Sequence, residues 1–99
     1  MYYAILCEDV ENSLPLRQSA RAAHLTRLQS LADQGKLLAA GPHPALDTEK
    51  PGQAGFTGSL IISEFDSLEA ATAWADLDPY VTAGVFSKII VKPYTLVLP

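Results

Sequence analysis

The sequence predicts one α+β domain, residues 1–99, in which a four-stranded antiparallel sheet has two helices on one face. The first observation is the order of segments: four short apolar runs are interrupted by two segments with helical spacing, giving strand, helix, strand, strand, helix, strand. The second is the length, because 99 residues suit a single domain with one core. The third is the composition, 48% hydrophobic and 18% charged, which is that of a folded chain.

Periodicity predicts the first strand and the first helix. Residues 2–7, YYAILC, are apolar on both alternating faces, which is typical of a strand buried on both sides. Residues 14–34 have helical spacing, and Gly35 ends this helix as glycine commonly does. One face of the helix is formed by Ala20, His24, Leu28 and Leu31.

A second strand and a long loop come next. Residues 36–41, KLLAAG, predict a short strand, which Pro42 and Pro44 end. The segment that follows, up to residue 58, is rich in glycine and proline and has no period. We therefore expect a long loop over residues 42–58, of the kind that often takes part in function.

The third strand and the second helix have clearer boundaries. Residues 59–65, SLIISEF, predict a strand, and residues 66–77, DSLEAATAWADL, predict a helix. Asp66 can cap this helix, and Glu69, three residues later, completes the pattern of a capping box.

The end of the second helix and the last strand complete the order. Pro79 disfavours helical geometry at Asp78, so the helix should end there. Residues 85–98 predict a fourth strand, in which Pro93 marks an edge, a bulge or the strand's end. The order βαββαβ is the ferredoxin-like arrangement, with both helices on one face of the sheet.

One layer of helices covers only one face of such a sheet. The last strand is apolar on both alternations, with Ile89 and Val91 on one side and Ile90 on the other. An apolar sheet face without a cover predicts a partner. We therefore expect a homodimer that packs through this sheet face.

Charge and composition exclude several classes of function. A net charge of −4 and a pI near 4.9 argue against nucleic acid as the main partner, because phosphate binding needs a basic surface. No apolar run approaches the ~20 residues that span a bilayer, and the start of the chain lacks the pattern of a secretory signal, so we expect a cytoplasmic protein. Cys7 is the only cysteine, which excludes an internal disulfide, and an inert buried thiol is the simplest interpretation.

The first helix contains a candidate anion site. Arg17, Arg21 and His24 stand at spacings of four and three, so they share one face. Two guanidinium groups beside an imidazole suit a carboxylate or another small anion. A solvated basic face, with the acidic residues of segment 8–11 as counterions, explains the same pattern and is the more common case.

Asp78 allows two interpretations. Asp-Pro commonly opens a turn, because the carboxylate accepts hydrogen bonds from nearby backbone amides. An aspartate that orients an imidazole is also a standard general-base arrangement, provided that the fold brings Asp78 to His24. Ser59, at the start of the third strand, is a further candidate site residue. No ligand spacing supports a metal site that combines His24 with His43, so we expect no metal and no cofactor.

Two long stretches, residues 17–45 and 55–94, resemble the YciI-like family. The resemblance rests on Arg-x-x-His in the first helix, Ala-Gly-Pro after the second strand and Gly-Ser before the third, together with Asp-Pro-Tyr followed by Ala-Gly-Val-Phe. It covers nearly the whole chain, in order and without large gaps.

The resemblance implies a fold and a site. Proteins of this family are ferredoxin-like α+β domains that dimerise through sheet packing, within the wider dimeric α/β-barrel group. The family's candidate active site is a histidine and an aspartate, which correspond to His24 and Asp78, and Arg17 or Arg21 and Ser59 would line the same pocket. A related dehydrochlorinase of aromatic degradation is thought to use such a His–Asp pair, and muconolactone isomerases share the fold.

Two hypotheses of function follow. In the first, the chain is a small cofactor-independent enzyme, a lyase or isomerase, in which the dyad of His24 and Asp78 performs acid–base chemistry on a small anionic or activated ring substrate. In the second, it is a non-enzymatic dimer that binds a small metabolite in the same pocket and releases it unchanged. The fold alone does not decide between them.

Overall fold

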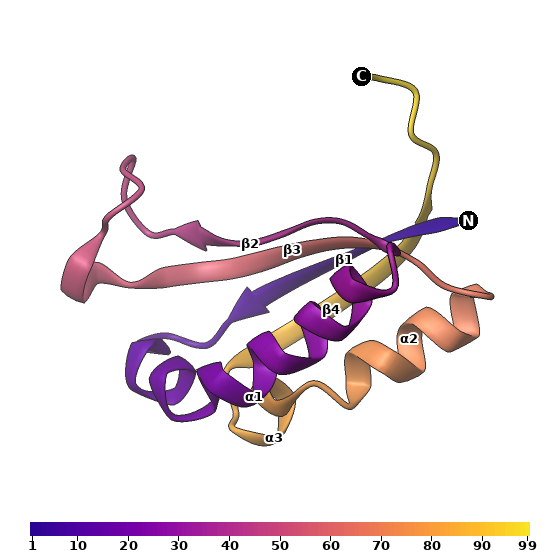
Figure 1. Ribbon diagram of the computed structural model, residues 1–99. Helices are drawn as coiled ribbons and strands as arrows, with labels where there is room; N and C mark the ends of the chain where they lie inside the picture. The colour runs from indigo at the N-terminus through magenta and orange to yellow at the C-terminus, as the bar shows by residue number, and fades with distance from the viewer.

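The computed structural model describes all 99 residues as an α+β sandwich (Figure 1). The elements are β1 (Tyr2–Asp9), α1 (Leu14–Asp33), β2 (Leu37–Pro44), the short 3-10 helix η1 (Gly52–Ala54), β3 (Phe56–Glu64), α2 (Leu68–Asp76), α3 (Pro79–Thr82) and β4 (Phe86–Tyr94). The four strands form one antiparallel sheet in the order β2-β3-β1-β4, and α1 and α2 cover the same face of it (Figure 1). The predicted ferredoxin-like α+β fold is confirmed. None of the helices combines the length and the apolar character needed to cross a lipid bilayer.

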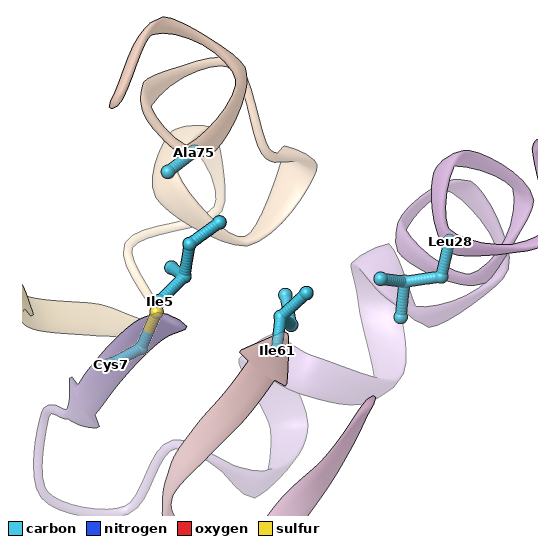
Figure 2. Close-up of a cluster of buried hydrophobic side chains, with 5 residues drawn as sticks. All are labelled: Ile5, Cys7, Leu28, Ile61 and Ala75. Atoms are coloured by element: carbon cyan, nitrogen blue, oxygen red, sulfur yellow. The ribbon is translucent and has the colours of Figure 1, made fainter. Parts of the chain in front are cut away.

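The core lies between the sheet and the two long helices. It consists of Ile5, Cys7, Leu28, Ile61 and Ala75, which Figure 2 shows at the junction of β1, β3, α1 and α2. Ile5 and Ile61 are partners in the sheet register and are almost fully buried. Burying a side chain of this size stabilises the fold by about 1.5–3 kcal/mol relative to leaving it exposed.

The second strand is longer than the sequence predicts. Pro42 and Pro44 do not end β2, because Pro42 pairs with Ser59 and Pro44 pairs with Phe56. The reason is that β2 is an edge strand, and a proline's missing N–H is tolerated where one side of the strand has no neighbour. The connection predicted over residues 42–58 is therefore reduced to 45–55.

The start of α2 also differs from the prediction. Ser67, not Asp66, is the N-cap, since its backbone is extended and its side chain accepts a hydrogen bond from the Ala70 N–H at 3.0 Å. The capping box with Glu69 therefore does not form. The helix begins at residue 68, and a serine hydroxyl satisfies the free N–H instead of a carboxylate.

The outer strand β4 ends at Tyr94, earlier than the predicted limit of residue 98. Pro93 lies within β4, which is the other edge of the sheet, in agreement with one of the predicted positions for it. The first strand extends to Asp9, beyond the predicted end at residue 7, and its register with β4 shifts between Glu8 and Asp9. This irregularity falls where Asp9 takes part in the candidate site described below.

The face of the sheet that points away from the helices is apolar at its centre. Ile5 and Cys7 pack toward the helices, so Leu6 between them lies on the open face, where its register partners are Leu60 and Ile90. Leu6 is 37% exposed, so β1 is not buried on both sides within one copy of the chain. Residues 95–99 leave the sheet on the same side, away from the helices (Figure 1).

Candidate active site

The candidate site begins with helix α1. Arg17 and His24 are seven residues apart, about two helical turns, so they lie on the same face of α1. That face points at the sheet, and each of the two residues is only 6% exposed. Arg21, between them, is exposed but still reaches the cavity that they line. The shared helix face predicted from the spacing is therefore present, but its members differ strongly in burial.

The structure brings His24 and Asp78 together. The imidazole Nδ1 lies 2.9 Å from both carboxylate oxygens, although the two residues are separated by 54 positions in the chain. Asp78 is 2% exposed, and its Oδ1 also accepts a hydrogen bond from the Tyr80 N–H at 2.9 Å. The carboxylate is thus fixed by a backbone amide on one side while it holds the imidazole on the other.

Asp78 can do this because the chain makes a second helix start immediately after α2. Its backbone is extended, as expected for a residue before proline, and it forms the N-cap of the short helix α3, with Pro79 in the first turn. The sequence did not predict α3. The turn role and the contact with His24, weighed as alternatives at Asp78, therefore exist in the same side chain.

Tyr80 forms one wall of the site and was not among the candidates. Its ring stacks on the imidazole of His24, with centroids 3.9 Å apart and planes 9° from parallel. Tyr80 is 3% exposed, and this burial raises the pKa of its hydroxyl, although the charges of Arg17 and Arg21 oppose the shift. The only sequence signal was its position directly after Asp-Pro, which does not by itself indicate a site.

The second imidazole nitrogen of His24 is left free. Nε2 has no hydrogen-bond partner in the protein. It is also not one of the buried polar atoms that lack a partner, so solvent can reach it. Because Nδ1 faces a carboxylate, the neutral ring carries its proton on Nδ1, and the lone pair of Nε2 is available. His24 is thus held in place through Nδ1, while Nε2 is accessible.

A cavity of about 440 Å³ lies in front of the imidazole. It is enclosed by α1, β2, β3 and α3, and its volume is within the usual range for small-molecule sites. Half of its lining is hydrophobic. The polar side chains that line it are Arg17, Gln18, Arg21, His24 and Ser59. Of the five residues proposed from the sequence, four therefore line this cavity, and the fifth, Asp78, lies behind the imidazole.

Arg17 is held differently from the expectation of an open basic face. Its Nε donates to Asp9 Oδ2 at 2.6 Å, and its Nη2 donates to Asp9 Oδ1 at 3.0 Å, so the two side chains form a bidentate ion pair. The same Nη2 donates to the Gly58 carbonyl at 2.9 Å and to Ser59 Oγ at 2.8 Å. Of the acidic residues in segment 8–11, Asp9 is thus the counterion, and the pair is buried rather than solvated.

Ser59 lies inside β3 rather than at its start, and its hydroxyl is an acceptor for Arg17. The second histidine, His43, is on β2 and lines a different cavity, so it does not join His24 in a metal site. Cys7 belongs to the hydrophobic core, and burial raises the pKa of its thiol to about 12. A thiol of this kind stays protonated and is a poor nucleophile.

Comparisons with known proteins agree with the fold described above. The sequence pattern of the YCII-related domain matches residues 1–95. Protein YciI of Escherichia coli O6:H1 is 60% identical over 94 residues, which cover 95% of this chain and 96% of that protein. An uncharacterized protein of Haemophilus influenzae is 51% identical over the same shares of the two chains.

Among solved structures, the chain is similar to the 5-chloro-2-hydroxyhydroquinone dehydrochlorinase TftG of Burkholderia phenoliruptrix AC1100. The two are 30% identical, with a TM-score of 0.83, over 96% of this chain and 94% of the other. That enzyme was solved in complex with 2,5-dihydroxybenzoquinone.

Proposed function

We propose that this chain, which belongs to the YCII-related family, is a small enzyme that performs acid–base chemistry on a ring compound with the dyad of His24 and Asp78. The reaction would be an elimination or an isomerisation, and it would need no cofactor. The observation that supports this most directly is the position of the imidazole, with a buried carboxylate on Nδ1 and a cavity at Nε2.

In this proposal, Nε2 of His24 removes a proton from a substrate carbon next to a carbonyl or on an activated ring. Asp78 stabilises the imidazolium that forms and keeps the ring in the orientation that presents Nε2. Tyr80, stacked on the imidazole, prevents the ring from tilting. A positioned acid–base group of this kind contributes roughly 10²–10⁴-fold to a rate, which suits a substrate that is already activated.

The class of substrate is inferred from the lining of the cavity and from the dehydrochlorinase relative. The apolar walls suit a planar ring, and Arg17, Arg21 and Ser59 supply donors for its oxygen atoms. A hydroxylated quinone or hydroquinone has both features. Hydrolysis through a covalent intermediate is a poorer fit, since the thiol of Cys7 is in the core and the hydroxyl of Ser59 is bonded to Arg17.

The test is a comparison of the two histidines. Wild type, His24→Gln and His43→Gln would be incubated with chlorinated and non-chlorinated hydroxyhydroquinones, and turnover would be followed by absorbance and chloride release. We expect His24→Gln to abolish turnover and His43→Gln to leave it unchanged, because His43 lies outside the cavity. Equal turnover in all three proteins would refute the mechanism. A ring compound that binds at His24 and is recovered unchanged would instead favour the non-enzymatic metabolite-binding function.

We also propose that the chain is a homodimer that packs through the open face of the sheet. The apolar centre of that face, around Leu6, and the exposed apolar tail of residues 95–99 on the same side support this. Leaving both in water would be unusual for a monomer. The active-site cavity lies on the opposite, helix-covered face, so dimerisation would leave it accessible.

A further inference from the structure

Arg17 is anchored on two of its three guanidinium nitrogens. Nε and Nη2 make four hydrogen bonds, to both carboxylate oxygens of Asp9, to the Gly58 carbonyl and to Ser59 Oγ. Asp9 is itself held by the hydroxyl of Ser13, which donates to Oδ2 at 2.6 Å. Its side chain is 1% exposed, so water does not compete for these bonds.

The third nitrogen, Nη1, takes part in none of these four hydrogen bonds, and it is not among the buried polar atoms that lack a partner. A further polar group beside the guanidinium is the hydroxyl of Tyr80, whose pKa is raised by burial, while its hydrogen bond with Arg17 acts to lower it. Because Arg17 lines the cavity, this nitrogen and its two N–H groups are the part of the guanidinium that a bound molecule can contact. The rings of Phe56 and Tyr80 lie near the guanidinium, each centroid 5.2 Å from Cζ.

Asp9 also changes what Arg17 can recognise. The positive charge of Arg17 is matched by a buried carboxylate at ion-pair distance, so the two side chains together contribute no net charge to the cavity. Arg21, by contrast, makes no ion pair within the protein and stays exposed at the cavity. A rigid donor whose charge is already balanced by a neighbouring carboxylate suits an oxygen that is neutral in the bound substrate and becomes negative during the reaction.

We propose that Asp9 is a positioning residue that fixes Arg17 with Nη1 as the donor to one ring oxygen, a carbonyl or hydroxyl oxygen conjugated with the carbon that His24 deprotonates. This inference rests on the proposed function and specifies its substrate class. His24 and Arg17 both contact the ring of Tyr80, so a molecule of one ring can reach both groups.

The electron balance of this step is simple. Nε2 of His24 takes the proton, the electron pair of the C–H bond becomes part of a C=C bond, and the carbonyl π electrons move onto the oxygen as an enolate. Nη1 donates a hydrogen bond to that oxygen as its charge grows, without reorganisation of the protein, because Asp9 and Ser59 already hold the guanidinium in place. Return of the electrons reforms the carbonyl. The C=C pair then expels chloride where chlorine is present on the adjacent carbon, and otherwise forms a new C–H bond with the proton that His24 gives back.

The positioning role can be tested in the free protein by ¹⁵N NMR of the arginine side chains. A guanidinium held by four hydrogen bonds should give slowly exchanging Nε–H and distinct Nη signals for Arg17. We expect Asp9→Asn to broaden or average these signals while the signals of Arg21 stay unchanged. Signals of Arg17 that are the same in Asp9→Asn as in wild type would overturn the proposal.

The recognition role needs a ligand, and the probe is 2,5-dihydroxybenzoquinone, the molecule bound by the dehydrochlorinase relative. Its Kd would be measured for wild type, Asp9→Asn, Arg17→Gln and the double variant. We expect each single variant to bind roughly 10- to 100-fold more weakly, the effect of losing one charge-assisted hydrogen bond, and the double variant to be no weaker than Arg17→Gln. Additive losses in the double variant would mean that Asp9 does not act through Arg17.

The outcomes separate this inference from the proposed function. If the wild type does not bind the quinone, the proposed ring substrate and the recognition half of this inference both fail, while the NMR experiment still decides the role of Asp9. If His24→Gln abolishes turnover but Asp9→Asn binds the probe normally, only this inference fails. Should Asp9→Asn not fold, Ser59→Ala removes one acceptor of Nη2 and keeps the ion pair. We then expect a smaller broadening of the Arg17 signals in the free protein, a measurement that does not depend on contact between Ser59 and the ligand, and unchanged signals would count against the proposal.

Discussion

The two faces of the sheet differ in a way that reverses a common expectation. The helix-covered face contains the buried polar side chains, among them Asp78 at 2% exposure and Arg17 and His24 at 6%. The open face has an apolar centre around Leu6, which is 37% exposed. Buried polar groups cost free energy unless they are paired, and partly exposed apolar groups contribute little to the stability of one copy. The first face therefore indicates a site, and the second indicates a partner.

The largest expected effect on stability lies in the covered face. Arg17→Met would leave Asp9 as a buried carboxylate without its counterion, and breaking such a pair costs about 3–5 kcal/mol. That is a large part of the usual stability of a small domain. The free energy of unfolding in urea would be compared with that of Arg21→Met, an exposed arginine one turn away, for which we expect a change within about 0.5 kcal/mol.

A second pair of variants tests the difference between the two faces with apolar residues. Ile5→Ala removes a 1% exposed side chain from the core, and we expect a loss of about 2–5 kcal/mol. Leu6→Ala, on the neighbouring residue but the opposite face, should cost less than about 1 kcal/mol at protein concentrations where the chain is monomeric. Urea unfolding at several protein concentrations would measure both. A loss for Leu6→Ala that is large and independent of concentration would contradict the assignment of that face to a dimer.

The dimer itself gives the next prediction. Leu6→Lys places a charge at the centre of the open face, where its register partners Leu60 and Ile90 are apolar. If this face is the interface, the variant should be a monomer by light scattering at a concentration at which the wild type is a dimer, and its far-UV circular dichroism should be unchanged. Ser19→Lys, an exposed position on α1, is the matched control, and it should keep the wild-type mass.

The fold was easier to predict from the sequence than the contacts among the candidate site residues. Strand and helix periods and the glycine after α1 are local signals, so the order of elements was confirmed. The pairing of Asp9 with Arg17 depends on where β1 ends relative to α1, and nothing in the local pattern distinguishes Asp9 from its acidic neighbours. The position of Tyr80 depends on the short helix α3. This helix has four residues, which are too few for its period to be recognised in the sequence.

The smallest expected effect concerns Cys7, which is in the core but close enough to the site that the charges of Asp78 and Asp9 add to the effect of burial. Burial, the larger cause, raises the pKa of its thiol from the ordinary 9.0 to about 12. Above pH 9 the unfolded chain therefore loses the thiol proton while the folded chain keeps it. The stability contributed by the protonated thiol is fully present below pH 9 and is lost as the pH rises toward about 12.

The direction of this pH dependence can be checked by urea unfolding of wild type and Cys7→Ala from about pH 8 to about pH 11. Cys7→Ala should be less stable than wild type at the lower pH because it leaves a small cavity, and the difference should shrink as the pH rises, since only the wild type loses the contribution of the thiol. A difference that stays constant with pH would mean that the thiol ionises as readily in the folded chain as in water. The covered face would then be more open to solvent at Cys7 than its 4% exposure indicates, and the contrast between the two faces would be weaker.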